Sequence, residues 1–148
     1  MSEESPTLLE MLKRSDGLLF LPANAGDLAG VLRRSRDGLG LEPPDDYMAF
    51  LRLTDGAVAD GLLLYGSKEH RFDDFEMPEL VEINLQRRDY RDDLADVLLV
   101  GEAGDDFLAF RRSDRRYWRI ERVSGDLLDD APDLNALVRI ALRYSEAA

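Results

Sequence analysis

The sequence predicts a single α+β domain, in which helices pack against one mainly antiparallel, twisted sheet of about four to six strands. Helical and strand-like apolar patterns alternate irregularly, which does not fit a parallel sheet built from regular βαβ units. No repeat, linker or compositional boundary divides the 148 residues, a length that can bury a core of its own. We expect residues 18–145 to form the core and residues 1–17 a helical N-terminal extension.

Two helices are expected before residue 40. Apolar residues at helical spacing predict a short helix over Thr7–Arg14, with Ser5 as its cap and Pro6 in its first turn. Asn24 or Asp27 can cap the second helix, because short polar side chains accept hydrogen bonds from unpaired backbone amides at a helix start.

Three more segments have helical patterns. Prolines, two first-turn carboxylates and a closing glycine predict a helix within Leu41–Gly56. The segment Pro78–Arg88 can place apolar residues on one side. The last helix is expected over Pro132–Tyr144, with Asp130 or Asp133 at its acidic start.

Strand character appears in four places. The glycine-bracketed segment Gly61–Gly66 is too short for a stable helix and is interpreted as a buried strand, and Asp96–Val100 as another. Aromatic and β-branched residues predict a hairpin of Phe107–Arg112 and Arg116–Val123, joined by Ser113–Arg115.

Charge is the most informative bulk property. The chain holds 31 Asp and Glu against 19 Lys and Arg, a net charge of -12, which repels nucleic acid and anionic lipid surfaces. The carboxylates are clustered at Asp45–Asp46, Asp73–Glu76, Asp92–Asp96, Glu102–Asp106 and Asp126–Asp133. A basic protein is the partner that this charge would attract, although acidity that merely maintains solubility is an open alternative.

The expected compartment is the cytoplasm. The chain has no cysteine, its N-terminal residues lack the pattern of a secretory signal, and no apolar run reaches the ~18 to 20 residues of a membrane span. We therefore expect a soluble protein without a membrane partner.

No group of residues indicates catalysis, a cofactor or a metal. His70 is the only histidine, and its charged neighbours suggest a solvated loop residue. Ser67 lies in no nucleophile pattern, and the turn Glu102–Asp106 has too few ligands for a calcium loop. The arginines between residues 111 and 122 are interpreted as partners of nearby carboxylates, and Tyr47, Tyr65, Tyr117 and Trp118 as core residues.

Five segments in order carry a resemblance to a known family: PDDYMAFLRLTDGAVADGLLLYG, ELVEINLQ, VLLVGEAGDDFLAF, YWRIERVSGD and DLNALVRIAL. Together they resemble the SUKH superfamily of SMI/KNR-like proteins, and specifically its YrhA-type members. The resemblance covers residues 18–144 and departs from the family pattern at Asp55, where asparagine is more usual before Gly56.

The resemblance implies protein binding. Bacterial members of the superfamily are similar to immunity proteins that neutralise polymorphic toxins, often nucleases, whereas fungal relatives resemble intracellular scaffolds or regulatory modules. Both functions remain open, as does a monomer or a weak homodimer. If a basic partner binds, carboxylates beside turns and helix starts are the expected contacts. These candidate residues are Asp45, Asp46, Asp60, Glu102, Asp105 and Asp106.

Overall fold

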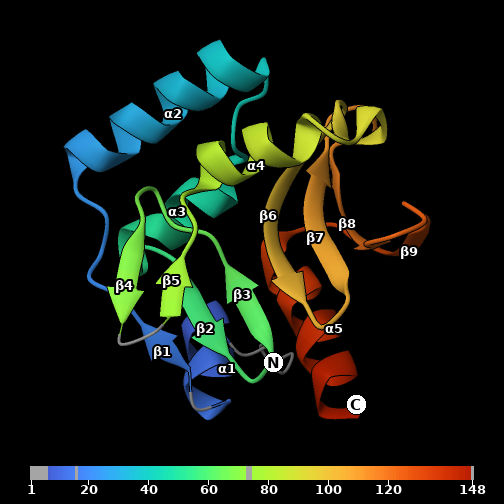
Figure 1. Cartoon of the computed structure of the whole chain (residues 1–148). Helices are drawn as coiled ribbons and strands as arrows, with labels where there is room; N and C mark the ends of the chain where they lie inside the picture. The colour runs from blue at the N-terminus through green and yellow to red at the C-terminus, as the bar shows by residue number, and fades with distance from the viewer. Residues whose placement is uncertain (1–6, 16, 73–74, 148) are drawn as a thin grey trace.

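The computed structural model describes residues 7–15, 17–72 and 75–147 (Figure 1). These residues form an α+β domain with a seven-stranded antiparallel sheet of order β1-β2-β3-β6-β7-β8-β9. The strands are β1 (Leu18–Leu19), β2 (Ala57–Ala59), β3 (Leu62–Leu64), β6 (Val97–Ala103), β7 (Asp106–Arg111), β8 (Arg116–Glu121) and β9 (Leu127–Ala131). A separate hairpin pairs β4 (His70–Phe72) with β5 (Phe75–Met77).

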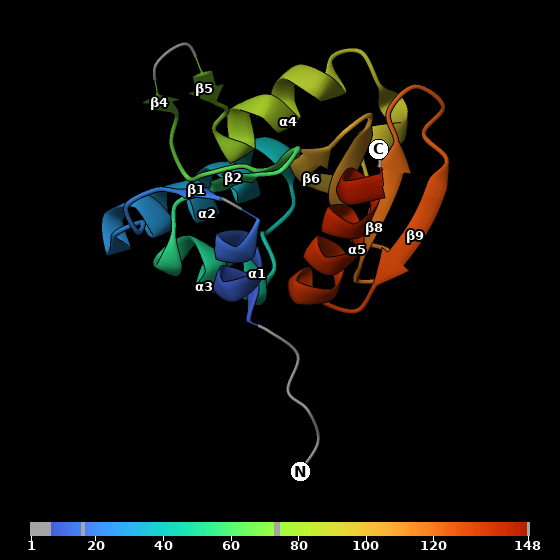
Figure 2. The same cartoon turned by 90° about the horizontal axis from the view of Figure 1, so that it is seen from below.

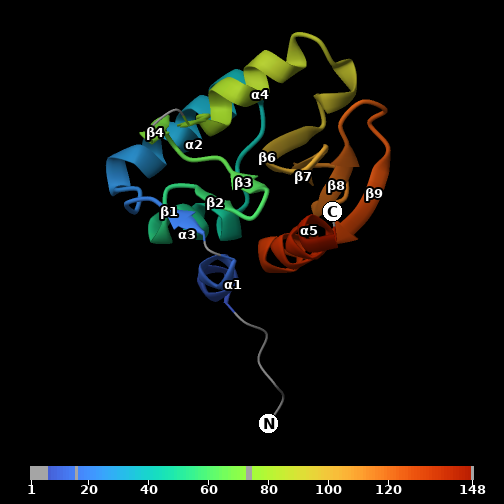
Figure 3. The same ribbon diagram turned by 60° about the horizontal axis from the view of Figure 1, so that its bottom comes forward.

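Helices lie on both sides of the sheet. The five described helices are α1 (Leu8–Arg14), α2 (Ala25–Leu39), α3 (Asp45–Leu53), α4 (Leu80–Arg88) and α5 (Leu134–Ala147), and a short 3-10 helix, η1, spans Asp92–Leu94. Figures 2 and 3 show α4 on one side of the sheet and α1 with α5 on the other. In addition, α2 packs on α4. None of the described helices is long and apolar enough to cross a membrane.

The helix starts follow from local capping. Asn24 accepts a hydrogen bond from the Asp27 amide at 2.8 Å, and Asp27 accepts one from the Asn24 amide at 3.2 Å. Both predicted residues therefore cap α2 in a reciprocal capping box. Thr7 caps α1 through the amide of Glu10, while the predicted residues Ser5 and Pro6 lie outside the described residues.

Tyr47 joins α3 to the sheet. Its side chain is fully buried, and its hydroxyl proton is shared between the carbonyl oxygens of Tyr65 and Val100. Burial raises the pKa of the Tyr47 hydroxyl well above its ordinary value, and the negative charge of Asp55 raises it further. The hydroxyl therefore keeps its proton, which it needs to satisfy these buried carbonyls.

The sheet is larger than the predicted four to six strands. Strands β1, β2 and β9 were not predicted. Strand β2 contains small residues, and β9 carries Asp129 and Asp130, which resemble the acidic start of a helix. Asp130 instead forms an ion pair with Arg116 on the neighbouring strand, while Asp133 accepts a hydrogen bond from the Ala136 amide and caps α5.

Helix α1, which lies within the expected N-terminal extension, packs into the core. Leu12 is fully buried, Met11 is nearly so, and both belong to the same apolar cluster as the sheet. Helix α1 contacts β2 and α5.

The arginines of the hairpin have the predicted acidic partners. Arg111 pairs with Asp114, Arg119 with Asp106 and Asp129, and Arg122 with Glu102. Two more pairs are Arg112 with Asp96 and Arg116 with Asp130. The interpretation of these arginines as local ion-pair partners is therefore confirmed for five of the six positions. The sixth is Arg115, whose guanidinium lies 6.0 Å from the ring centre of Phe110.

Replacing Arg111 by methionine should raise the pKa of Asp114. The Arg111 guanidinium, 2.7 Å away, is the main cause that lowers this pKa from about 3.8 to about 2, and hydrogen bonds from the Trp118 indole and the Arg116 amide add to it. Because the folded value is the lower one, the carboxylate stabilises the fold above the ordinary pKa, and this contribution is lost as pH falls toward 2. NMR titration of Asp114 measures the shift. The control Arg112→Met, which removes a partner of Asp96, should leave the pKa of Asp114 unchanged.

Candidate protein-binding surfaces

Four of the six predicted contact residues gather at one end of the sheet. Asp60 lies in the turn between β2 and β3, and Asp105 in the turn between β6 and β7. The amide of Gly104 donates to the carbonyl of Gly61 at 3.4 Å, so these turns are neighbours. Glu102 and Asp106 occupy the adjoining strand ends.

Glu102 and Asp106 are held by side-chain contacts within the fold. Glu102 accepts hydrogen bonds from the Tyr65 hydroxyl at 2.7 Å and from Arg122 at 2.6 Å. Asp106 forms an ion pair with Arg119, whose side chain is 12% exposed. Asp60 and Asp105 are exposed. Glu102 and Asp106 therefore stabilise the sheet end, while the two turn residues face solvent.

The other two predicted residues, Asp45 and Asp46, form the start of α3, which lies next to the start of α5. Asp46 accepts a hydrogen bond from the Tyr117 hydroxyl at 2.7 Å and another from the Leu134 amide at 2.8 Å. This carboxylate joins α3 to β8 and α5. Asp45 is exposed beside it.

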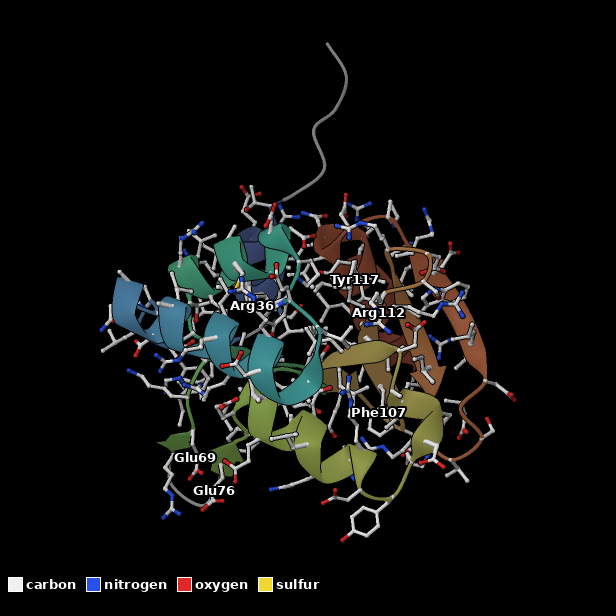
Figure 4. The ribbon with its side chains drawn as sticks, turned by 90° about the horizontal axis from the view of Figure 1, so that it is seen from above. Arg36, Glu69, Glu76, Phe107, Arg112 and Tyr117 are labelled. Atoms are coloured by element: carbon white, nitrogen blue, oxygen red, sulfur yellow. The ribbon has the colours of Figure 1, made fainter. Side chains whose placement is uncertain are left out.

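A further acidic surface lies between the β4–β5 hairpin and α4. A cavity of about 180 Å³ is open there, and we call it the acidic cavity. It is lined by Glu69, Glu76, Met77, Pro78, Glu79, Glu82, Ile83 and Gln86. Figure 4 shows Glu69 and Glu76 close together beside the hairpin.

The cations near this cavity neutralise only part of its charge. Arg71 is 3.2 Å from Glu69 and 2.9 Å from Glu76, so one guanidinium serves two carboxylates. Glu79 pairs with Arg34 at 3.0 Å and also caps the start of α4. Glu82 adds a fourth, exposed carboxylate. Four carboxylates thus face two guanidiniums, and the cavity suits a cationic side chain.

The sequence did not indicate this cavity because it did not predict the β4–β5 hairpin. Glu79 and Glu82 are three residues apart on one helix, a signal that was available. Glu69 and Glu76 come together only through the pairing of His70 with Met77 and of Arg71 with Glu76. The acidic residues 73 and 74 of the predicted cluster lie outside the described residues.

Neither a protein-family model nor a curated protein matches this chain.

The second surface feature is apolar. A groove of about 310 Å³ runs between α3 and the start of α5, with α1 at one side, and we call it the α3–α5 groove. It is lined by Leu8, Asp46, Ala49, Phe50, Leu53, Asp133, Leu134 and Asn135. Leu53 is 53% exposed, so the wall of the groove presents a large apolar side chain to solvent.

The sequence suggested that His70 is a solvated loop residue, and this prediction is wrong. His70 begins β4, its side chain is 15% exposed, and its Nε2 lies 2.8 Å from Oδ2 of the fully buried Asp55. The ring stacks on Phe20 with centres 4.5 Å apart. Asp55 also accepts a hydrogen bond from the Ser67 amide at 2.8 Å. These contacts of His70, Asp55 and Ser67 join the segment before β4 to the end of α3.

This cluster contains serine, histidine and aspartate but lacks the geometry of a catalytic triad. Ser67 is 2% exposed, and its hydroxyl has no hydrogen-bond partner within the described part of the chain. A triad needs the nucleophile hydrogen-bonded to the base and accessible to substrate. Among residues 7–15, 17–72 and 75–147, no group of three or more potential ligands could hold a metal ion.

Proposed function

We propose that this protein is a non-catalytic binding domain that neutralises a basic toxin by covering its cationic surface. The observation that carries the proposal is the acidic cavity, in which four carboxylates face two guanidiniums on a chain of net charge -12. The resemblance of the sequence to the SUKH superfamily supports the same function.

The charge suits this function in a specific way. A nuclease presents cations to phosphate, so an acidic protein can occupy the same surface and block it. Complementary charge mainly accelerates association and selects the partner, and its effect declines as salt screens it. Glu69, Glu76 and Glu82 line the acidic cavity and are exposed, so an approaching cationic surface can reach them.

A pull-down from native cell lysate at low ionic strength, repeated at high salt, tests the proposal. Capture of a basic toxin domain that salt releases, and whose activity the purified protein inhibits, is the expected result. Capture of a host protein that salt does not release would instead support the scaffold function. If no protein is captured at low salt, the proposed function is wrong.

Neutralising the cavity should slow association with the captured toxin. The double variant Glu69→Gln and Glu76→Gln should lower the association rate about fivefold at low salt and change dissociation less, because rim charges act mainly on encounter. Stopped-flow or surface-based kinetics measure both rates. The control, Asp37→Asn with Asp126→Asn, changes net charge equally at exposed positions outside the cavity. Equal slowing by both pairs would contradict a specific role for the cavity.

A further inference from the structure

We infer that the α3–α5 groove seats an apolar side chain presented by a cationic segment of the protein partner. This inference rests on the proposed function and assigns the groove as a second, apolar contact with the partner, on the side of the sheet opposite α4 and the acidic cavity (Figures 2 and 3). Protein interfaces derive most of their binding energy from a few apolar anchors, while charged rims add rate and specificity. An acidic surface alone would associate quickly and dissociate quickly.

The apolar wall of the groove continues onto a neighbouring segment. The amide of Ala23 donates to the carbonyl of Leu51 at 2.9 Å, and the amide of Asp55 to the carbonyl of Leu21 at 3.2 Å. Residues 21–23 therefore run along the end of α3, the helix that carries Leu53. Leu21 is 85% exposed and Leu53 is 53% exposed. The segment that pairs with the end of α3 thus adds an exposed apolar side chain of its own.

Carboxylates define one end of the groove. Asp46 and Asp133 line it, and Asp45 is exposed next to Asp46 at the start of α3. Asp46 accepts hydrogen bonds from the Tyr117 hydroxyl and the Leu134 amide, and Asp133 caps α5. Both carboxylates are therefore fixed in place. Arg52 is an exposed cation farther along α3. Arg139 of α5 donates to the groove residue Asn135 at 2.8 Å. Among the described residues named here as neighbours of the apolar wall, three carboxylates thus stand against two cations, and this net negative charge complements cations that flank an apolar side chain.

The same charge disfavours a second copy of this chain as the occupant. A symmetric contact through the groove would bring the acidic ends of both copies together, on molecules that each carry a net charge of -12. A cationic segment removes this repulsion, and its apolar residue can still bury Leu53. The occupant is therefore a segment of a basic partner.

An NMR titration of the full chain with three capped tripeptides tests the inference without a known partner. The probes are Arg-Leu-Arg, Arg-Gly-Arg and Glu-Leu-Glu. The amides of Ala49, Phe50, Leu53 and Leu134 should shift with Arg-Leu-Arg. Their shifts should be about fivefold smaller with either of the other peptides, because one lacks the apolar side chain and the other reverses the flanking charge.

A variant pair makes the titration specific. Leu53→Asn should weaken Arg-Leu-Arg binding about tenfold, since it removes most of a leucine-sized apolar contact. The control Val123→Asn alters a side chain that is 84% exposed and outside the groove, and should leave binding unchanged. Unshifted groove amides, or equal shifts with all three peptides, would overturn the inference. If the groove amides do not shift but the pull-down captures a basic toxin, the proposed function stands and the inference about the groove is wrong. If the groove amides shift as expected but the pull-down captures no protein, the proposed function is wrong.

Discussion

Replacing His70 by alanine should lower the free energy of unfolding by about 3 kcal/mol at neutral pH. The side chain of Asp55 is fully buried, and His70 is the side-chain partner that the structure gives it, at 2.8 Å. Without the imidazole, this carboxylate would keep the hydrogen bond from the Ser67 amide. Alanine would also remove the stacking on Phe20. Equilibrium urea unfolding measures the loss.

Two further variants test whether the buried Asp55 carboxylate causes this loss of stability. Arg71→Ala removes exposed ion pairs on the same strand and should cost less than about 1 kcal/mol. Adding Asp55→Asn to His70→Ala should recover part of the lost stability, because the uncompensated charge is then absent. A cost for His70→Ala no greater than that for Arg71→Ala would show that Asp55 does not depend on His70.

The helices could be predicted because their signals are local. Asn24 and Asp27 cap each other across three residues, and Pro44 directly precedes the first turn of α3. Such contacts form within one turn, so the sequence contains both partners side by side. Apolar spacing similarly placed Tyr47, Phe50 and Leu51 on the buried side of α3.

The extra strands could not be predicted because their reasons are distant in sequence. Strand β9 is acidic, and it becomes compatible with a sheet only beside Arg116 and Arg119 of β8. Strand β3 itself was predicted, but its pairing with β6 requires that Gly101 has no side chain, since a β-carbon there would lie 2.1 Å from the carbonyl oxygen of Leu63. Neither requirement is visible in a short window of sequence.

The same limit applies to the predicted contact residues. Their exposure was inferred from their place near turns and helix starts, which is correct for Asp45, Asp60 and Asp105. Asp46, however, meets Tyr117 across 71 positions, and Glu102 meets Tyr65 across 37. Composition indicates how many carboxylates a protein has, but tertiary structure determines which of them have internal partners.

Asn84→Leu should cost about 3 kcal/mol of unfolding free energy, although leucine is apolar and similar in size. Strand β3 pairs only with Gly101–Ala103 of the longer β6, which leaves Leu99 beyond its end. Asn84, which is 1% exposed, completes this edge. Its amide nitrogen donates to the Leu99 carbonyl at 2.8 Å, and its oxygen accepts from the Leu99 amide at 2.7 Å. Leucine would leave both backbone groups buried without a partner.

The position of Asn84 in α4 allows a sharp comparison in urea unfolding. Leu85→Ala, one residue along, trims a side chain that is 43% exposed and should cost less than about 1 kcal/mol. One turn later, Arg88 donates to the Val97 carbonyl at 3.3 Å, so α4 replaces a missing strand along β6 at two successive points. If Asn84→Leu were as mild as Leu85→Ala, β6 would not depend on α4 for its backbone hydrogen bonds. A large loss would identify α4 as the element that completes the sheet beside the acidic cavity, whose Glu79 and Glu82 lie at the start of the same helix.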